Sequence, residues 1–296
     1  MTISMETLAD KIIDFNASLD FRGSLPEGIR IMNPFRENEA VMDVSTAFYR
    51  KYYNDHAPRH LILGINPGRF GAGLTGIPFT DPKHLTEQCD IPYAGPRAHE
   101  PSSVFIYDMI RAFGGPEVFY RQFYISAVCP LGFTNLLSTN LSSTNLSSIN
   151  LSSSEGHDSV SLQDQTIKDN ESAFPIKKTL KGTAYALRLG GSLDGKLDSK
   201  VREVNYNYYD SKELTRCVSD FIVENLTTQL SLGLERNVCF CLGTGKNEKY
   251  LRELNNRYGF FEKIVALEHP RYIMQYKNKR KEEYIEKYLE AFSQVK

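Results

Sequence analysis

Three features that would each identify a class of protein are missing from the sequence. The net charge is only -1 at pH 7 over 296 residues, so a nucleic-acid partner would have to be held by a local basic patch, because the whole molecule exerts no long-range attraction on it. No apolar run reaches the ~18 residues that a membrane span needs. The N-terminus, MTISMETLADKI, has no basic stretch followed by an apolar one. We therefore expect a globular protein of the cytoplasm.

The cysteines also lack the spacing of a metal site. Of the five, Cys239 and Cys241 alternate along an apparent strand, whereas Cys89, Cys129 and Cys217 lie far apart in the chain. Zinc and iron–sulfur sites need cysteines clustered at short spacings. The pattern favours free thiols in a reducing compartment, and it predicts no metal ligand.

A repeated segment interrupts the chain. Residues 138–152 read STNLS, STNLS and SINLS, which is too polar and too regular for a packed core. From there to about residue 202 the chain has few large apolar residues, so burial would not offset the entropy of ordering it. We expect a single domain over residues 1–296, with a disordered or poorly ordered insertion at about 138–202.

Four short apolar runs stand out when the insertion is set aside, and each has the length and branching of a buried strand. Asp210, with Glu213 three residues later, is predicted to cap a helix that begins near residue 211. Strands that alternate with helices favour an α/β fold, here a three-layer sandwich whose central four-stranded parallel sheet is flanked by helices. The predicted strands are 59–65, 122–129, 237–243 and 262–268, and the predicted helices are 39–53, 103–113, 211–231, 247–257 and 272–292.

Glycine, proline and polar residues follow each predicted strand. The turns read NPGRFG, PLGF, TGKN and HPRY, in chain order. The carboxyl ends of parallel strands share one edge of the sheet, and open α/β sheets bind their ligands there. Asn66 and His269 are therefore predicted to face each other across one cleft.

At these strand ends, three motifs resemble the uracil-DNA glycosylase superfamily, and within it the single-strand-selective monofunctional branch or a bacterial relative. They are GINPGRFGAGLTGIPF (64–79), CPLGF (129–133) and HPR (269–271). The first is long and specific, and the resemblance spans most of residues 59–292 apart from the insertion. It implies a monofunctional DNA glycosylase of base excision repair, which flips a deaminated base out of DNA and hydrolyses its N-glycosidic bond.

The resemblance also implies a role for single residues. Asn66 would position the attacking water, and His269 would hydrogen-bond a carbonyl of the leaving base and stabilise its negative charge. The flipped base would stack on Phe79, the backbone amides of Ile65 and Phe79 would line the pocket, and Phe70 belongs to the same base-binding motif. No metal and no other cofactor is implied. Judged singly, Asn66 could be a turn residue, His269 a surface histidine and Phe79 part of the core.

One departure concerns base recognition. The second strand of this branch supplies an asparagine that contacts the edge of the uracil, where this sequence has Ser126 and Ala127. Asn205 or Asn207, just beyond the insertion, could replace it, although both could equally be turn residues. A pocket without that asparagine could admit hypoxanthine or xanthine as well as uracil.

Residues near the two outer motifs are predicted to contact DNA. The histidine motif is shorter than in the family, and Arg271 or Tyr272 would be what remains of the wedge that fills the gap left by the flipped base. Basic side chains would follow the phosphates, although a charged helix face is usually only solvated, and a Gly-x-Gly-Lys turn is often plain punctuation between a strand and a helix. The predicted DNA-binding residues are Gly68, Arg69, Pro270, Arg271, Tyr272 and Lys246, with Lys277, Lys279, Arg280 and Lys281 nearby.

Two other functions remain open. The chain could be a catalytically inactive member of the fold that binds DNA, although the presence of both Asn66 and His269 argues against this. It could also be an α/β hydrolase acting on free nucleotides, with its glycine turns holding phosphate. The expected partner is single- or double-stranded DNA that contains deaminated bases, and we expect no membrane partner and a monomer.

Overall fold

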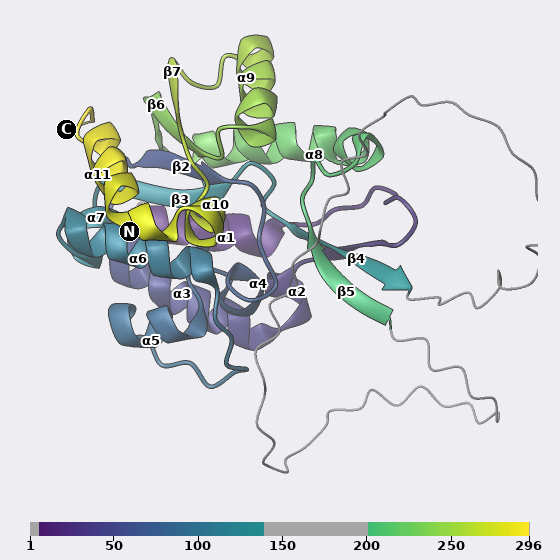
Figure 1. Cartoon of the computed structure of the whole chain (residues 1–296), viewed down its shortest axis with the longest axis horizontal. Coiled ribbons are helices and arrows are strands. Elements are labelled where there is room, and N and C mark those ends of the chain that lie inside the picture. Colours follow the sequence, from purple (N-terminus) through teal and green to yellow (C-terminus); the bar gives the residue numbers. More distant parts are fainter. Residues whose placement is uncertain (1–5, 139–200, 296) are drawn as a thin grey trace, which may run out of the picture. The chain divides into compact units, whose positions relative to one another are not determined.

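The structure is a computed structural model, and it describes residues 6–138 and 201–295 (Figure 1). The predicted insertion falls almost entirely on residues 139–200, which lie outside the described residues, as does most of the repeat at 138–152. Within the described part of the chain, no helix is long and apolar enough to cross a membrane.

A four-stranded parallel sheet forms the centre of the fold, as predicted. Its order is β3-β2-β6-β7, and every neighbouring pair is parallel. Strands covered on both faces need apolar side chains on both, which is why they read as continuous apolar runs; β3 is buried along its whole length. The strands are β2 (His60–Gly64), β3 (Phe123–Ala127), β6 (Glu235–Leu242) and β7 (Lys263–Leu267).

Helices flank this sheet. Phe123 of β3 packs on the rings of α6, α7 and α11. The next residue, Tyr124, points to the opposite face of the sheet and packs on α3. The arrangement confirms the predicted α/β class. The helices are α1 (Leu8–Ser18), α2 (Pro34–Glu37), α3 (Glu39–Tyr53), α4 (Ala72–Thr75), α5 (Pro82–Cys89), α6 (Pro101–Phe113), α7 (Pro116–Tyr120), α8 (Lys212–Ser231), α9 (Lys246–Tyr258), α10 (Pro270–Tyr276) and α11 (Lys281–Phe292), with a 3-10 turn at Asn278–Arg280.

The start of α8 differs from the prediction. Ser211, not Asp210, is the N-cap residue, and its hydroxyl accepts a hydrogen bond from the backbone N–H of Leu214 at 3.0 Å. The Asp210 carboxylate instead accepts from the backbone N–H of Asn207 at 2.8 Å. Both residue types cap helices well. Asp210 does not cap α8 because its carboxylate is already hydrogen-bonded within the turn at 207–210.

The predicted C-terminal helix, 272–292, is also divided. α10 ends at Tyr276, Lys277 leaves the helical conformation (φ -127°, ψ 16°), and α11 begins at Lys281. The polar run between the two helices contains no buried residue, so no apolar contact holds a continuous helix there. Within α11, Tyr288 and Phe292 are almost completely buried.

A second, antiparallel sheet was not predicted. Its order is β1-β4-β5, from β1 (Ile29–Met32), β4 (Gly132–Ser138) and β5 (Val201–Tyr206). Ser138 pairs with Val201, and Phe133 pairs with Tyr206, so β4 extends to residue 138 and β5 begins at residue 201. The mixed polar and apolar residues of β4 and β5 gave no continuous apolar run. This sheet leads the chain back to the loop that follows β2.

Candidate active site

Asn66 follows β2 and is held at both ends of its amide. Its Nδ2 donates to the carbonyl oxygens of Tyr206 at 3.2 Å and Pro67 at 3.3 Å, and its Oδ1 accepts from the backbone N–H of Tyr208 at 3.1 Å. These bonds fix which way the amide points. An amide oxygen has two lone pairs, so Oδ1 keeps one with which to accept a hydrogen bond from a water molecule.

Tyr208 connects this amide to the edge of the parallel sheet. Its fully buried hydroxyl donates to Oδ1 of Asn247 at 2.8 Å. Asn247 Nδ2 donates in turn to the carbonyl of Leu242, at the end of β6, at 3.0 Å, and approaches the carbonyl of Gly64, at the end of β2, at 3.4 Å. A fully satisfied buried network of this kind makes a site rigid.

Phe79 ends the long glycine-rich motif in an uncommon backbone conformation, with φ at 54°. Its ring packs directly on Gly64, where a Cβ atom would come within 2.9 Å of ring carbon Cε2. The centroid of the same ring lies 5.6 Å from that of His269. Left-handed conformations of large residues cost free energy and cluster at functional sites, and here the strain places an aromatic ring beside both strand ends.

His269 caps α10 at the end of β7. Its Nδ1 accepts from the backbone N–H of Arg271 at 3.1 Å, so the neutral ring carries its proton on Nε2. Burial, and to a smaller extent the positive charge of Arg271, lower the pKa of His269 to about 4. Tyr288 of α11 donates a hydrogen bond to the carbonyl of the preceding residue, Glu268. At neutral pH the imidazole is therefore an uncharged hydrogen-bond donor at Nε2.

The sequence predicted one cleft, and the structure has two adjoining cavities that share Ile65. The smaller, of about 40 Å³, is lined by Asn66 and Phe79 among others, and the larger, of about 480 Å³, is lined by His269. Phe79 lies at the boundary, since its ring faces His269. One water needs ~10–15 Å³ on this scale, so the smaller cavity holds only a few waters and would have to widen to admit a base.

The other predicted base-binding residues occupy different positions. Ser126 is buried and lines the smaller cavity. Asn205 accepts from the backbone N–H of Arg69 at 3.1 Å, which fixes the glycine-rich loop, whereas the Asn207 amide donates to Asp210 at 3.3 Å and lines neither cavity. Phe70 is 48% exposed. Of the two candidate amides, only Asn205 contacts the loop that carries Asn66.

Three of the six predicted DNA-binding residues line one of these cavities. Gly68 lines the smaller one and Lys246 and Tyr272 the larger, and Pro270 is the buried first residue of α10. Arg69 forms an ion pair with Glu203 at 3.3 Å and lies over the Phe70 ring, while Arg271 forms no ion pair with another described residue. Tyr272 and Tyr276 are 43% and 65% exposed, and their rings pack at 5.5 Å.

Two of the nearby basic residues already have partners on the protein. Arg280 is bound by Glu283 at 2.6 Å, and Lys281 by Asp108 at 2.5 Å. The cation that remains next to His269 is Arg271.

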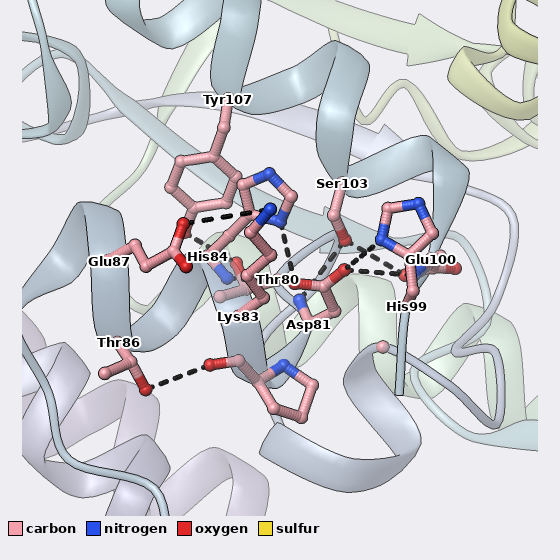
Figure 2. A network of polar contacts seen from close by, with 12 residues as sticks. Thr80, Asp81, Lys83, His84, Thr86, Glu87, His99, Glu100, Ser103 and Tyr107 are labelled. Carbon is pink, nitrogen blue, oxygen red and sulfur yellow. Dashed lines mark hydrogen bonds and ion pairs between the residues drawn. The ribbon is translucent and has the colours of Figure 1, made fainter. Parts of the chain in front are cut away.

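The sequence did not predict a carboxyl group in the smaller cavity, yet Glu100 is one of its lining residues. Figure 2 shows Glu100 beside Ser103 and Asp81. The fully buried Asp81 accepts from the backbone N–H of Glu100 at 3.0 Å and contacts His84 Nδ1 at 2.7 Å. Glu100 precedes a helix that begins with a proline, a common arrangement, so nothing in its local sequence pointed to this cavity.

Two other residues of the site were also not predicted. No local motif distinguishes Tyr208. Asn247 belongs to a turn that follows a predicted strand, and could have been suspected.

Together, these groups can orient a water, present a neutral hydrogen-bond donor and support a flat ring. This is the chemistry needed to break a bond whose leaving group becomes negative while the other fragment becomes positive. Hydrogen bonds within the protein fix the direction of both Asn66 and His269, so neither side chain has to be reoriented for the reaction.

Comparison with known proteins agrees with this geometry. Residues 50–293 match the family described as the uracil DNA glycosylase superfamily. Among solved structures, the crystal structure of wild-type SMUG2 from Pedobacter heparinus is similar to this chain, with 49% sequence identity and a TM-score of 0.76. The match covers 98% of this chain and 99% of the other.

Proposed function

Because the chain belongs to the uracil DNA glycosylase superfamily, and is therefore a DNA glycosylase that hydrolyses N-glycosyl bonds, we propose that it removes uracil from DNA with Asn66 and His269 as its catalytic residues. A water held by Oδ1 of Asn66 adds to the sugar carbon as the bond to the base breaks. His269 donates from Nε2 to a carbonyl of the departing base and stabilises the negative charge that develops there.

The observation that supports this assignment best is the preset direction of both groups. The backbone N–H of Tyr208 fixes Oδ1 of Asn66, and the backbone N–H of Arg271 fixes the proton of His269 on Nε2. Both stand at the carboxyl edge of one parallel sheet, with the Phe79 ring close to the imidazole. A base stacked on that ring would gain about 1–3 kcal/mol and would lie within reach of both.

The proposal extends to hypoxanthine and xanthine. Ser126 and Ala127 line the smaller cavity where the family's asparagine would contact uracil, so no amide on β3 selects a pyrimidine. The edge that these three deaminated bases share, a carbonyl beside a ring N–H, is then what the pocket has to recognise. The similarity to the Pedobacter heparinus protein named SMUG2 supports a glycosylase of this branch.

An abasic-site assay tests the proposal. Single- and double-stranded oligonucleotides carrying uracil, hypoxanthine, xanthine or a mismatched thymine are incubated with the protein, and abasic sites are cleaved with alkali. We expect cleavage at the first three bases. A protein that binds these oligonucleotides without releasing any base would be an inactive member of the fold, and hydrolysis of free nucleotides alone would indicate the other alternative.

A further inference from the structure

The smaller cavity contains one carboxyl group that the proposed reaction does not use. Among the described residues that line it, Glu100 is the only ionisable one. It shares this cavity with Asn66, Phe79 and Ser126, so its carboxyl lies in the space next to the predicted catalytic amide and the predicted stacking ring.

The glycine-rich loop leaves room for this carboxyl. A Cβ atom on Gly71 would overlap Glu100 Oε2, and one on Gly68 would lie 3.3 Å from Oε1. Ser103, one turn into α6, donates a hydrogen bond to Oε2 at 3.4 Å, and its own oxygen accepts from the backbone N–H of Asp81 at 3.2 Å. The carboxyl is thus held against two glycines, with one oxygen occupied by a donor.

The surroundings of Glu100 favour its protonated form. Burial and the negative charge of Asp81 raise the pKa of its carboxyl to about 7, against smaller opposing effects of the Ser103 hydrogen bond and of Arg271 on α10. Burial also acts on Asp81, but hydrogen bonds from His84 and from the backbone of Glu100 keep the pKa of Asp81 below its usual value. Two neighbouring carboxyls with pKa values driven apart can take different roles.

Two histidines also lie near Glu100. His84 on α5 and His99 in the preceding loop both contact Asp81, at 2.7 and 3.5 Å (Figure 2). Neither is hydrogen-bonded to the Glu100 carboxyl. Both histidines therefore act on Asp81 directly and on Glu100 only through Asp81, so a variant at position 100 can separate the two effects.

We propose that Glu100 recognises the flipped base in place of the missing asparagine, its carboxylic acid donating O–H to the base carbonyl and accepting from the adjacent ring N–H. This inference rests on the proposed function and names the residue that selects its substrates. A protonated carboxyl presents one donor and one acceptor side by side, as an amide does. An ionised carboxylate can only accept and would face the base carbonyl without a hydrogen bond.

This pairing accounts for a substrate class rather than for one base. Uracil, hypoxanthine and xanthine all present a carbonyl next to a ring N–H, whereas cytosine and adenine present an amino group next to an unprotonated ring nitrogen. Because Ser103 donates to Oε2, the proton is favoured on Oε1. The donor is then at Oε1 and the acceptor at Oε2. This order matches a base with a carbonyl beside a ring N–H, and mismatches a base with an amino group beside an unprotonated nitrogen.

Single-turnover excision of uracil from a single-stranded oligonucleotide, measured from pH 5.5 to pH 9, tests the inference. For wild type we expect a plateau below pH 7 and a fall of about tenfold per pH unit above it, as the carboxyl ionises. Glu100→Gln keeps a donor and an acceptor at every pH, so its rate should stay near the wild-type plateau over the whole range. Glu100→Ala should lower the plateau by ~10- to 100-fold, as expected for lost hydrogen bonds in a buried site.

Glu87→Gln is the matched control, because Glu87 is exposed on α5 and its one ion pair among the described residues is with Lys83. It should keep the wild-type profile, and the thermal unfolding midpoint of each variant shows whether it is folded. Wild-type rates and pH dependence in Glu100→Ala, or a Glu100→Gln profile that still falls above pH 7, would overturn the role of Glu100 while leaving the glycosylase function standing. No release of uracil by wild type at any pH would overturn both.

Discussion

Asn66 and His269 stand at the ends of different strands, and the contacts that hold them differ in range. Asn66 is fixed by Tyr206 and Tyr208, about 140 residues away in the chain. His269 is fixed mainly by its own helix, through the backbone N–H of Arg271. The amide therefore depends on correct packing of a distant segment, whereas the imidazole is positioned as soon as β7 and α10 form.

The largest effects should come from removing either group. Asn66→Ala and His269→Ala are each expected to lower the single-turnover rate of uracil excision by at least ~100-fold, in line with the loss of one electrostatic stabiliser. Asn54→Ala, at the exposed end of α3, is the control and should keep the wild-type rate. If either active-site variant retains wild-type activity, the residue that it replaces has no catalytic role.

Removing the buried hydroxyl of Tyr208 should have a smaller effect than removing Asn66 or His269, and mainly on stability. Tyr208→Phe removes the hydroxyl that donates to Asn247 and leaves a buried acceptor unpaired. We expect the free energy of unfolding, measured with urea, to fall by about 1–3 kcal/mol, with a loss of excision activity well below that of Asn66→Ala. Tyr258→Phe, whose ring is 43% exposed, should change neither. If Tyr208→Phe and Tyr258→Phe lost the same free energy of unfolding, the hydrogen bond from Tyr208 to Asn247 would not stabilise the protein.

The low pKa of His269 predicts how kcat/KM depends on pH below pH 7. Burial lowers the pKa of His269 to about 4, so its neutral, donating form persists, and kcat/KM should not decline between pH 7 and pH 5. An unfolded histidine titrates near 6.5. The unfolded chain thus binds the proton first, and the contribution of His269 to folding stability is lost as the pH falls from about 6.5 towards 4. A decline in kcat/KM centred near pH 6.5 in wild type and absent from His269→Ala would contradict this.

Arg271 should affect DNA binding more than chemistry. If it contacts one phosphate, Arg271→Ala should reduce the slope of log affinity against log salt concentration by about 0.7 on single-stranded DNA, measured by fluorescence anisotropy. Arg22→Ala, an exposed arginine that pairs with Asp20, should leave the slope unchanged. An unaltered slope in Arg271→Ala would remove this residue from the DNA-binding surface.

The smallest effect is expected from the insertion. Ser138 and Val201 are paired neighbours in β4 and β5, so a short glycine-containing turn can join them directly in place of residues 139–200. We expect uracil excision to remain within about twofold of wild type, a change of about 0.4 kcal/mol. A loss as large as that of Asn66→Ala would mean that the insertion contributes to the site.

The sequence predicted the parts of the fold that local patterns control. The buried runs of β2 and β3 and the glycine-rich motif after β2 could be recognised without any knowledge of packing. So could the placement of Asn66 and His269 after two strands of one parallel sheet. The second sheet could not, because β4 and β5 have mixed polarity and are separated by the insertion. Their pairing depends on neighbours that are distant in the chain.

Glu100 shows the same limit for the site. Its pKa depends on the burial of its carboxyl and on Asp81, and its position depends on the missing Cβ of Gly71. These are consequences of tertiary contacts among loops that no sequence motif connects. Phe79 was predicted from its motif, but its left-handed backbone and its contact with Gly64 emerged only from the folded chain.

The most direct test of the account is a crystal structure of the protein bound to a single-stranded oligonucleotide that carries a uracil nucleotide resistant to hydrolysis. We predict that the uracil stacks on Phe79, with one carbonyl within about 3.2 Å of Nε2 of His269 and a water between Oδ1 of Asn66 and the sugar carbon. A uracil bound outside both cavities, or an imidazole that contacts no atom of the base, would contradict the central claim.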